Sequence, residues 1–98
     1  SLSTMANSLY YLLANNGSQT EVVNTLYHLN SWADWTRLVS LFGTKKVNLN
    51  DSTFSLCAIL SINCQSVDLG TLMKVKLDAN RKQDINDYFN EVGIPEQF

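Results

Sequence analysis

The chain has 98 residues, of which 45% are hydrophobic and 16% are charged, and its net charge is −2. A chain of this length buries one modest core, so we expect a single domain over residues 1–98. Nucleic acid is not an expected partner, because phosphate binding needs several Lys or Arg side chains on one face. A membrane is not expected either, since no apolar run approaches the ~18 residues of a membrane-spanning helix.

The first half of the chain contains three amphipathic segments with apolar residues at helical spacing. They cover residues 3–15, 19–29 and 31–42. Ser18 is the expected N-cap of the second segment, with Glu21 three residues later as in a capping box. Ser31 and Asp34 repeat this arrangement for the third segment, and Gly43 ends it. The short links between the segments favour antiparallel helices.

The second half of the chain predicts two further helices, at residues 68–77 and 80–92. Asn80 is the expected start of the last helix, and Gly93 and Pro95 end it. The expected fold class is therefore all-α, with five helices.

Residues 44–67 break this helical pattern. A polar, turn-rich stretch precedes a nearly continuous apolar run over residues 54–62, which periodicity cannot assign to a strand or a helix. We expect a partly irregular insertion packed over the helices. A small domain has limited room to hide such a run, so its apolar residues are also candidate interface residues. These are Phe54, Leu56, Ile59, Leu60 and Ile62, with Ile59 and Leu60 expected to anchor the segment on the helical body or on a partner.

The apolar face of each predicted helix indicates the core. For the third helix the expected buried face is Trp32, Trp35, Leu38, Val39 and Phe42. The aromatic residues could instead form a ligand-facing cluster, but their i,i+3 spacing favours packing. The expected core includes Leu9, Leu12, Leu26, Trp35, Leu38, Phe42, Leu72, Ile85 and Phe89.

Few residues suggest catalysis or metal binding. His28 is the single histidine and has no acidic residue three or four positions away to orient it. Cys57 and Cys64 lack the neighbours of a zinc site, and we expect two reduced thiols in a reducing compartment. A thiol dyad with His28 would need a cation beside the cysteine to lower its pKa. We therefore expect no enzyme, no cofactor and no small-molecule substrate.

The order of these segments resembles a single annexin repeat. Gly17-Ser18 matches the Gly-Thr loop of that family, Leu41-Phe42-Gly43 matches its Leu-Phe-Gly, and residues 68–77 match its Asp-Leu-x-x-x-Met-Lys-x-x-Leu pattern. Residues 44–67 have no counterpart in the family. The resemblance implies a five-helix annexin-repeat-like bundle with an insertion between the third and fourth helices.

Annexins bind calcium through loop carbonyls and a distant carboxylate, and this chain departs from the pattern at both places. Asn15 stands where the first loop glycine is expected, and Lys76 stands where the carboxylate is expected. Calcium requires six to eight oxygen ligands, and a cation at the carboxylate position repels it. Calcium binding of the annexin type is therefore expected to be lost.

A narrower resemblance concerns annexin-like modules of bacterial and tailed-phage proteins. It is carried by Trp32-Ala33-Asp34-Trp35 and by the pattern of residues 85–98. It implies a non-catalytic protein-interaction or structural assembly module of a phage virion or a bacterial multi-domain protein, in the cytoplasm or the virion. The expected partner is another protein or a further copy of the chain. The alternative is a lipid or membrane-surface binding module of annexin type.

Overall fold

The structure is a computed structural model, and it describes residues 1–50 and 56–98. The described part is mostly helical, with five helices of eight or more residues, one helix of five residues and a two-stranded sheet. The elements in chain order are α1 (Leu2–Ala14), α2 (Gln19–Leu26), α3 (Trp32–Phe42), β1 (Lys45–Val47), α4 (Leu56–Leu60), β2 (Gln65–Val67), α5 (Leu69–Lys76) and α6 (Ala79–Val92).

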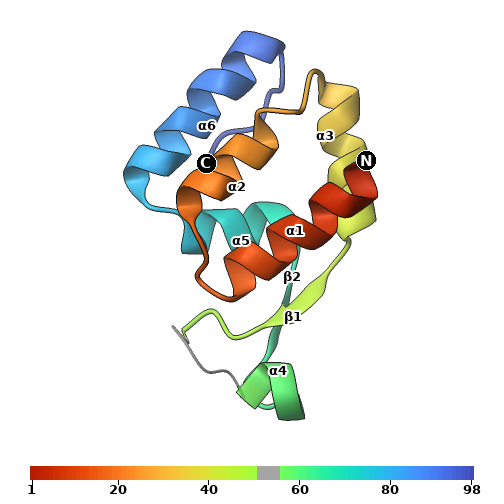
Figure 1. Cartoon of the computed structure of the whole chain (residues 1–98), viewed down its shortest axis with the longest axis vertical. Coiled ribbons are helices and arrows are strands. Elements are labelled where there is room, and N and C mark those ends of the chain that lie inside the picture. Colours follow the sequence, from red (N-terminus) through yellow and green to blue (C-terminus); the bar gives the residue numbers. More distant parts are fainter. Residues whose placement is uncertain (51–55) are drawn as a thin grey trace.

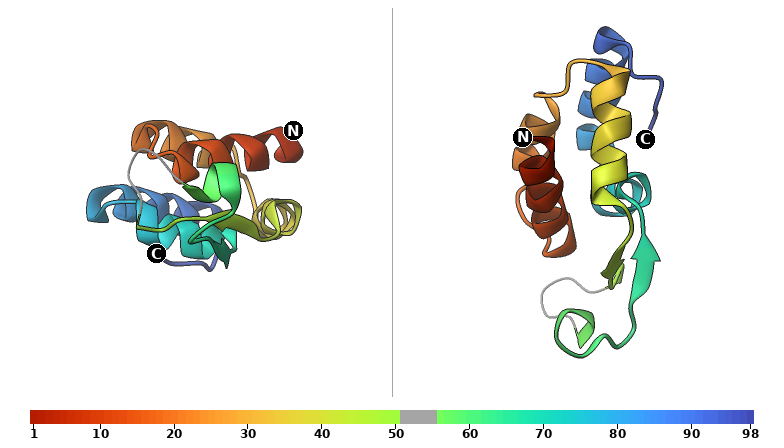
Figure 2. Two further views of the ribbon diagram at one scale, coloured as in Figure 1. Left: turned by 90° about the horizontal axis from the view of Figure 1, so that it is seen from below. Right: turned by 90° about the vertical axis from the view of Figure 1, so that its right-hand side faces the viewer.

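The five longer helices form two layers around one core. Helices α1 and α2 lie in one layer, and α3, α5 and α6 lie in the other (Figures 1 and 2). The core is formed by side chains from all five of these helices and from both strands. Its largest fully buried side chains include Leu9, Leu26, Leu38, Phe42, Leu72, Ile85 and Phe89. Each of these residues was an expected core residue, whereas Leu12 is only half-buried.

Side-chain caps define the start of each longer helix. Ser18 Oγ accepts a hydrogen bond from Glu21 N at 3.2 Å, and Ser31 Oγ accepts one from Asp34 N at 3.2 Å. Both predicted N-caps are confirmed. The last helix begins at Ala79 rather than Asn80, because Asp78 caps it by accepting a hydrogen bond from Arg81 N at 2.8 Å.

The helix ends depend on backbone geometry. Gly43 ends α3 with a φ of 62°, and Gly93 ends α6 with a φ of 80°, both in the left-handed region that glycine adopts without strain. The second helix ends at Leu26 and not at Leu29, because the chain tightens there into turns in which His28 N donates to Thr25 O and Leu29 N donates to Leu26 O. The buried Leu29 side chain nevertheless belongs to the core.

The expected all-α class fits the described part broadly, and two features depart from it. The chain is not purely α-helical, because β1 and β2 pair as an antiparallel ladder in which Lys45 faces Val67 and Val47 faces Gln65. The packing over the helices that was expected for residues 44–67 is not seen for α4, which lies beyond the strands at the far end of the molecule (Figure 1).

Candidate functional site

The segment that joins α3 to α5 forms a projection from the helical body. We call β1, α4, β2 and the described residues between them the projection. Its base is fixed in the core, because Val47 and Val67 are buried there. Tyr10 Oη of α1 donates a hydrogen bond to Lys46 O at 3.1 Å, and Lys45 Nζ lies 5.6 Å from the centre of the Tyr10 ring. The projection is therefore attached firmly at its base.

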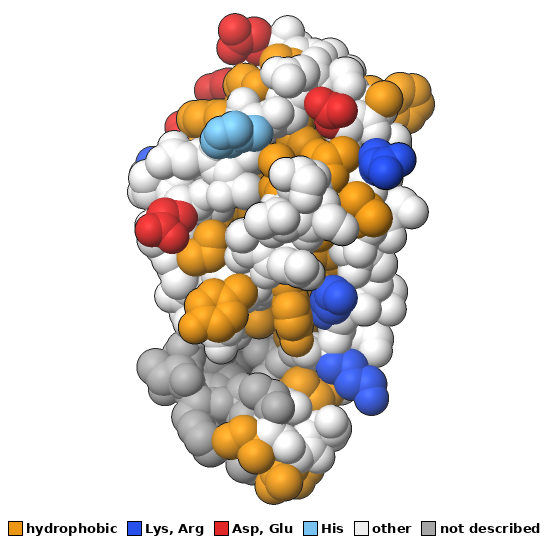
Figure 3. Space-filling view, turned by 45° about the vertical axis from the view of Figure 1, so that its right-hand side comes forward, with side chains coloured by type: hydrophobic (Ala, Val, Ile, Leu, Met, Phe, Trp, Pro, Cys, Tyr) orange, Lys and Arg blue, Asp and Glu red, His pale blue; other side chains and the backbone are white. Residues whose placement is uncertain are grey.

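The far end of the projection exposes apolar side chains. Ile59 is 63% exposed, Leu60 is 61% exposed and Ile62 is 44% exposed. We call these three residues the apolar tip. In the space-filling view, hydrophobic side chains are visible at the lower end of the molecule, and others are spread over the rest of this face (Figure 3). Of the five candidate interface residues, Phe54 and the side chain of Leu56 lie outside the described part, and the other three form the apolar tip.

Two alternatives were expected for Ile59 and Leu60, docking onto the helical body or onto a partner, and the structure does not show the first. Both side chains point into solvent, because the two strands carry α4 away from the helices (Figure 2). Docking onto a partner stays a prediction.

A disulfide joins Cys57 to Cys64, so the expectation of two reduced thiols is wrong. The reversal of the chain between α4 and β2 brings the two Cα atoms to 5.2 Å, a normal separation for bonded cysteines. The signal in the sequence was the pairing of two cysteines seven positions apart in a segment without helical periodicity. That spacing is compatible with a local disulfide but does not require one.

The backbone of the tip contains two unusual residues. Ser61 has a φ of 56° and Asn63 a φ of 58°, both in the left-handed region that non-glycine residues rarely adopt. They lie on either side of Ile62. Ser61 N donates a hydrogen bond to Cys57 O at 3.1 Å, which closes the turn after α4. Together with the disulfide, this turn determines where the apolar tip points.

A shallow pocket of about 400 Å³ lies between the end of α2 and the outer face of α6. Its aromatic wall is Tyr27 and Tyr88, whose ring centres are 4.9 Å apart. The Tyr88 hydroxyl shares its proton between Tyr27 O at 2.8 Å and Leu29 O at 2.6 Å, which ties α6 to the end of α2. Sequence reasoning missed this pair, because nothing local relates two tyrosines 61 positions apart.

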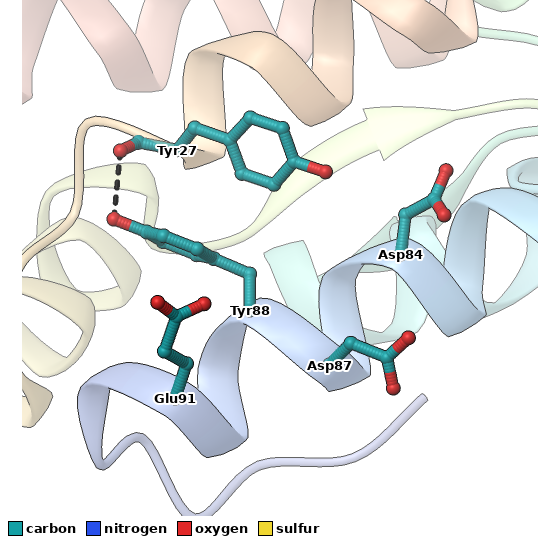
Figure 4. Close-up of a pocket in the computed structure, with 5 residues that line it drawn as sticks. All are labelled: Tyr27, Asp84, Asp87, Tyr88 and Glu91. Carbon is teal, nitrogen blue, oxygen red and sulfur yellow. Dashed lines mark hydrogen bonds between the residues drawn. The ribbon is translucent and has the colours of Figure 1, made fainter.

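Three carboxylates line the same pocket, and Figure 4 shows them along α6: Asp84, Asp87 and Glu91. Asp84 pairs with Arg81 Nε at 3.0 Å, and Asp87 accepts a hydrogen bond from Gln83 Nε2 at 2.8 Å. These partners lie on α6 itself, and none of the three carboxylates is buried. An open, hydrated site of this kind lacks the exclusion of water that most acid–base catalysis uses.

The expected candidates for catalysis do not meet in one site. His28, in the turn after α2, has its Nδ1 3.1 Å from the backbone oxygen of Asn24 in α2, and its side chain is exposed. Both cysteine sulfurs are bonded to each other. A thiol dyad between a cysteine and His28 is therefore not available in this structure.

The loop that resembles the annexin calcium loop lies against Lys76. Lys76 Nζ donates a hydrogen bond to Asn16 Oδ1 at 3.3 Å, although the two residues are 60 positions apart. The Lys76 side chain of α5 thus brings a positive charge to the loop between α1 and α2. Within residues 1–50 and 56–98, no group of three or more His, Cys, Asp and Glu side chains is arranged to hold a metal ion.

Gly17 in the same loop lies close to Leu12 of α1 and has no unusual φ. A Cβ atom at this position would lie 2.9 Å from Leu12 Cδ2 and 3.3 Å from Leu12 O. A larger residue at position 17 would therefore require Leu12 to shift slightly. The left-handed residue of the turn is Asn16, with a φ of 54°.

None of the helices in the described part of the chain has the length and apolar character needed to cross a membrane. Comparison of the chain with protein-family models, curated proteins and solved structures gives no match.

Proposed function

We propose that this chain is a non-catalytic protein-interaction or structural assembly module that docks through the apolar tip. The observation that carries the proposal is the exposure of Ile59, Leu60 and Ile62 on a projection whose base is anchored in the core. Isolated exposed apolar residues are common, but three of them gathered at the end of a protruding segment mark an interaction surface. A protein partner with a complementary apolar pocket would bury them.

The absence of catalysis is part of this proposal. It is supported by the disulfide, which leaves neither Cys57 nor Cys64 as a thiol, and by the backbone partner of His28. The carboxylates beside Tyr27 and Tyr88 are open to solvent, which fits a hydrated surface better than an active site.

The proposal also includes an annexin-repeat-like arrangement of the five longer helices, in a phage virion or a bacterial multi-domain protein. Support for the arrangement comes from the contact of Lys76 with the loop at Asn16, since the resemblance requires that these distant segments meet. The setting in a virion or a bacterial assembly rests on the resemblance of residues 32–35 and 85–98 to phage and bacterial modules.

The alternative of an annexin-type lipid-binding module is weaker. Annexin lipid contact, as the resemblance implies it, passes through bound calcium, and here the Lys76 ammonium group occupies the loop. The apolar tip lies on the projection, which has no counterpart in the annexin repeat.

The test combines a double variant of the tip with a matched control. Ile59→Ser/Leu60→Ser removes two of the three apolar side chains of the tip. Val75→Ser removes an apolar side chain of similar exposure on α5, where Val75 is 50% exposed. We expect all three proteins to melt within about 2 °C of one another, because exposed substitutions change stability little. We expect the tip variant alone to lose self-association in sedimentation velocity or capture of the partner by the full-length protein.

Site-specific photo-crosslinking locates the contact. A photoreactive amino acid at position 60 should give one discrete crosslinked product in the native assembly, and the same amino acid at position 75 should not. The proposal fails if the tip variant retains both self-association and partner capture, or if position 75 gives the same product as position 60.

A further inference from the structure

The disulfide closes a ring that contains the whole apolar tip. Ile59, Leu60 and Ile62 all lie between Cys57 and Cys64 in the chain. Because these three side chains are largely exposed, packing against the helical body does not hold them in place. Within the described residues, the covalent ring, α4 and the turn after α4 are the features that shape the tip.

The backbone inside the ring is held in a costly conformation. Ser61 and Asn63 both have positive φ values, and left-handed backbone costs energy for residues other than glycine, although Asn tolerates it better than Ser. Such residues persist where the surrounding structure determines their geometry. Opening the ring would remove that constraint, and both residues could return to ordinary φ values. Ile62 lies between them, so it would turn relative to Ile59 and Leu60.

The base of the projection does not depend on the disulfide. Val47 and Val67 are buried in the core, and the β1–β2 ladder joins the two strands that carry them. Tyr10 Oη adds a hydrogen bond from α1 to β1. Opening the ring should therefore change the tip and leave the helical body unchanged.

We infer that the Cys57–Cys64 disulfide is a redox switch of the docking surface, with the oxidised form presenting the apolar tip and the reduced form releasing it. This inference rests on the proposed function, because it concerns the regulation of the same surface. The reductant is a dithiol, and Cys64 is the better target because it is half-buried whereas Cys57 is almost fully buried.

The exchange proceeds in two balanced steps. A thiolate of the dithiol attacks Cys64 Sγ, the Cys57–Cys64 bond breaks, and Cys57 leaves as a thiolate that takes up a proton. The second thiol of the reductant then displaces Cys64, which also ends as a thiol. The reductant is oxidised to its own disulfide, and the protein gains two electrons and two protons.

Amide hydrogen exchange tests whether the ring shapes the tip. In the wild-type protein, reduction should raise the exchange rates of residues 57–64 by about tenfold or more, because a disulfide of this loop size contributes more than one factor of ten to local order. The amides of α1 and α6 should not change. Cys57→Ser/Cys64→Ser should behave as the reduced protein with or without reductant, and reoxidation of the wild type should restore slow exchange.

A conformation-specific binder tests the consequence for docking. A synthetic single-domain binder is selected against the oxidised protein and counter-selected against Ile59→Ser/Leu60→Ser. Its dissociation constant should rise about tenfold or more for the reduced protein and for the double cysteine variant, which corresponds to the loss of the ordered tip.

Two outcomes would overturn the inference. One is that reduction changes neither the exchange of residues 57–64 nor the affinity of the binder. The other is that the amides of α1 and α6 accelerate equally, because the disulfide would then stabilise the whole domain and not the tip. Neither outcome affects the photo-crosslink at position 60, so failure of the switch is distinguishable from failure of the proposed function.

Discussion

The two tryptophans of α3 show how position on a helix determines whether a side chain is buried or exposed. Trp35 is 5% exposed, and its ring centre lies 5.1 Å from that of Phe89 and 5.9 Å from that of Phe98. Trp32 was expected in the same buried face but is 58% exposed. At ~100° per residue, Trp32 points roughly 90° away from the centre of the stripe formed by Trp35, Leu38 and Phe42.

This difference predicts unequal effects of truncation. Trp35→Ala should lower the free energy of unfolding by about 3–5 kcal/mol, because it empties a site packed by aromatic rings. Trp32→Ala should change it by no more than about 0.5 kcal/mol, as is usual for an exposed side chain. Urea unfolding of the two variants measures both values. Similar losses for the two variants would contradict this placement of Trp32.

At the scale of single elements, the caps give each helix a definite start. Asp68 Oδ1 accepts a hydrogen bond from Thr71 N at 2.8 Å and caps α5. The hydrogen bonds from the backbone and side chain of Thr71 lower the pKa of the Asp68 carboxyl, and the charge of Lys74 adds to the effect. The ionised carboxylate is therefore the form that the folded state favours.

A lowered pKa in the folded state links the cap to pH. The contribution of Asp68 to stability should be complete above its unfolded-state pKa of about 3.9 and should disappear as the pH falls through the lower, folded-state value. Asp68→Asn keeps an acceptor oxygen but loses this titration. The difference in urea midpoint between wild type and variant should therefore be largest near neutral pH and should shrink below about pH 4. A difference independent of pH would refute the assignment.

At the scale of the whole molecule, polar contacts join segments far apart in the chain. Lys76 Nζ reaches Asn16, and Asp78 N donates a hydrogen bond to Gln19 Oε1 at 2.8 Å across 59 positions. These contacts hold the junction of α5 and α6 against the loop between α1 and α2. The loop between α1 and α2 is thus held by side-chain hydrogen bonds, and the positive charge of Lys76 lies beside it.

This arrangement predicts the response to calcium. Millimolar calcium should leave the melting temperature of the wild-type protein unchanged, because a ligand stabilises a fold only by binding it. Lys76→Glu should create at most a weak calcium-dependent increase, because Asn15 still stands in place of the expected loop glycine. Differential scanning fluorimetry of both proteins, with magnesium as a control, measures the shift. A clear stabilisation of the wild type by calcium would reverse the ranking of the two functions.

Local chemistry accounts for what could be predicted about the helices. Five helical segments, the caps at Ser18 and Ser31 and the glycine ends at Gly43 and Gly93 follow from residue patterns only a few positions long. The buried positions Leu26, Phe42, Ile85 and Phe89 follow from helical periodicity. These rules depend on near neighbours, so the sequence contains enough information to apply them.

The candidate site could be predicted only in part. The sequence identified Ile59, Leu60 and Ile62 as unusual, because an apolar run interrupts a polar segment. It could not show whether the helical body would cover them, since that depends on the direction in which two short strands leave the core. The disulfide likewise requires the reversal of the chain between Cys57 and Cys64, and hydrophobic periodicity does not predict that reversal.

The sequence by itself determined a small helical domain, its capped helices and most of its core, because hydrophobic spacing and capping act over a few residues. The tertiary structure alone decided the β1–β2 ladder, the outward position of the apolar tip and the contact of Lys76 with Asn16. The ladder and the Lys76 contact bring together residues between 18 and 60 positions apart. The position of the tip depends on the direction in which the two strands leave the core. Such contacts form only when the whole chain has closed around its core, which is why the exposure of the apolar tip became visible in the folded molecule.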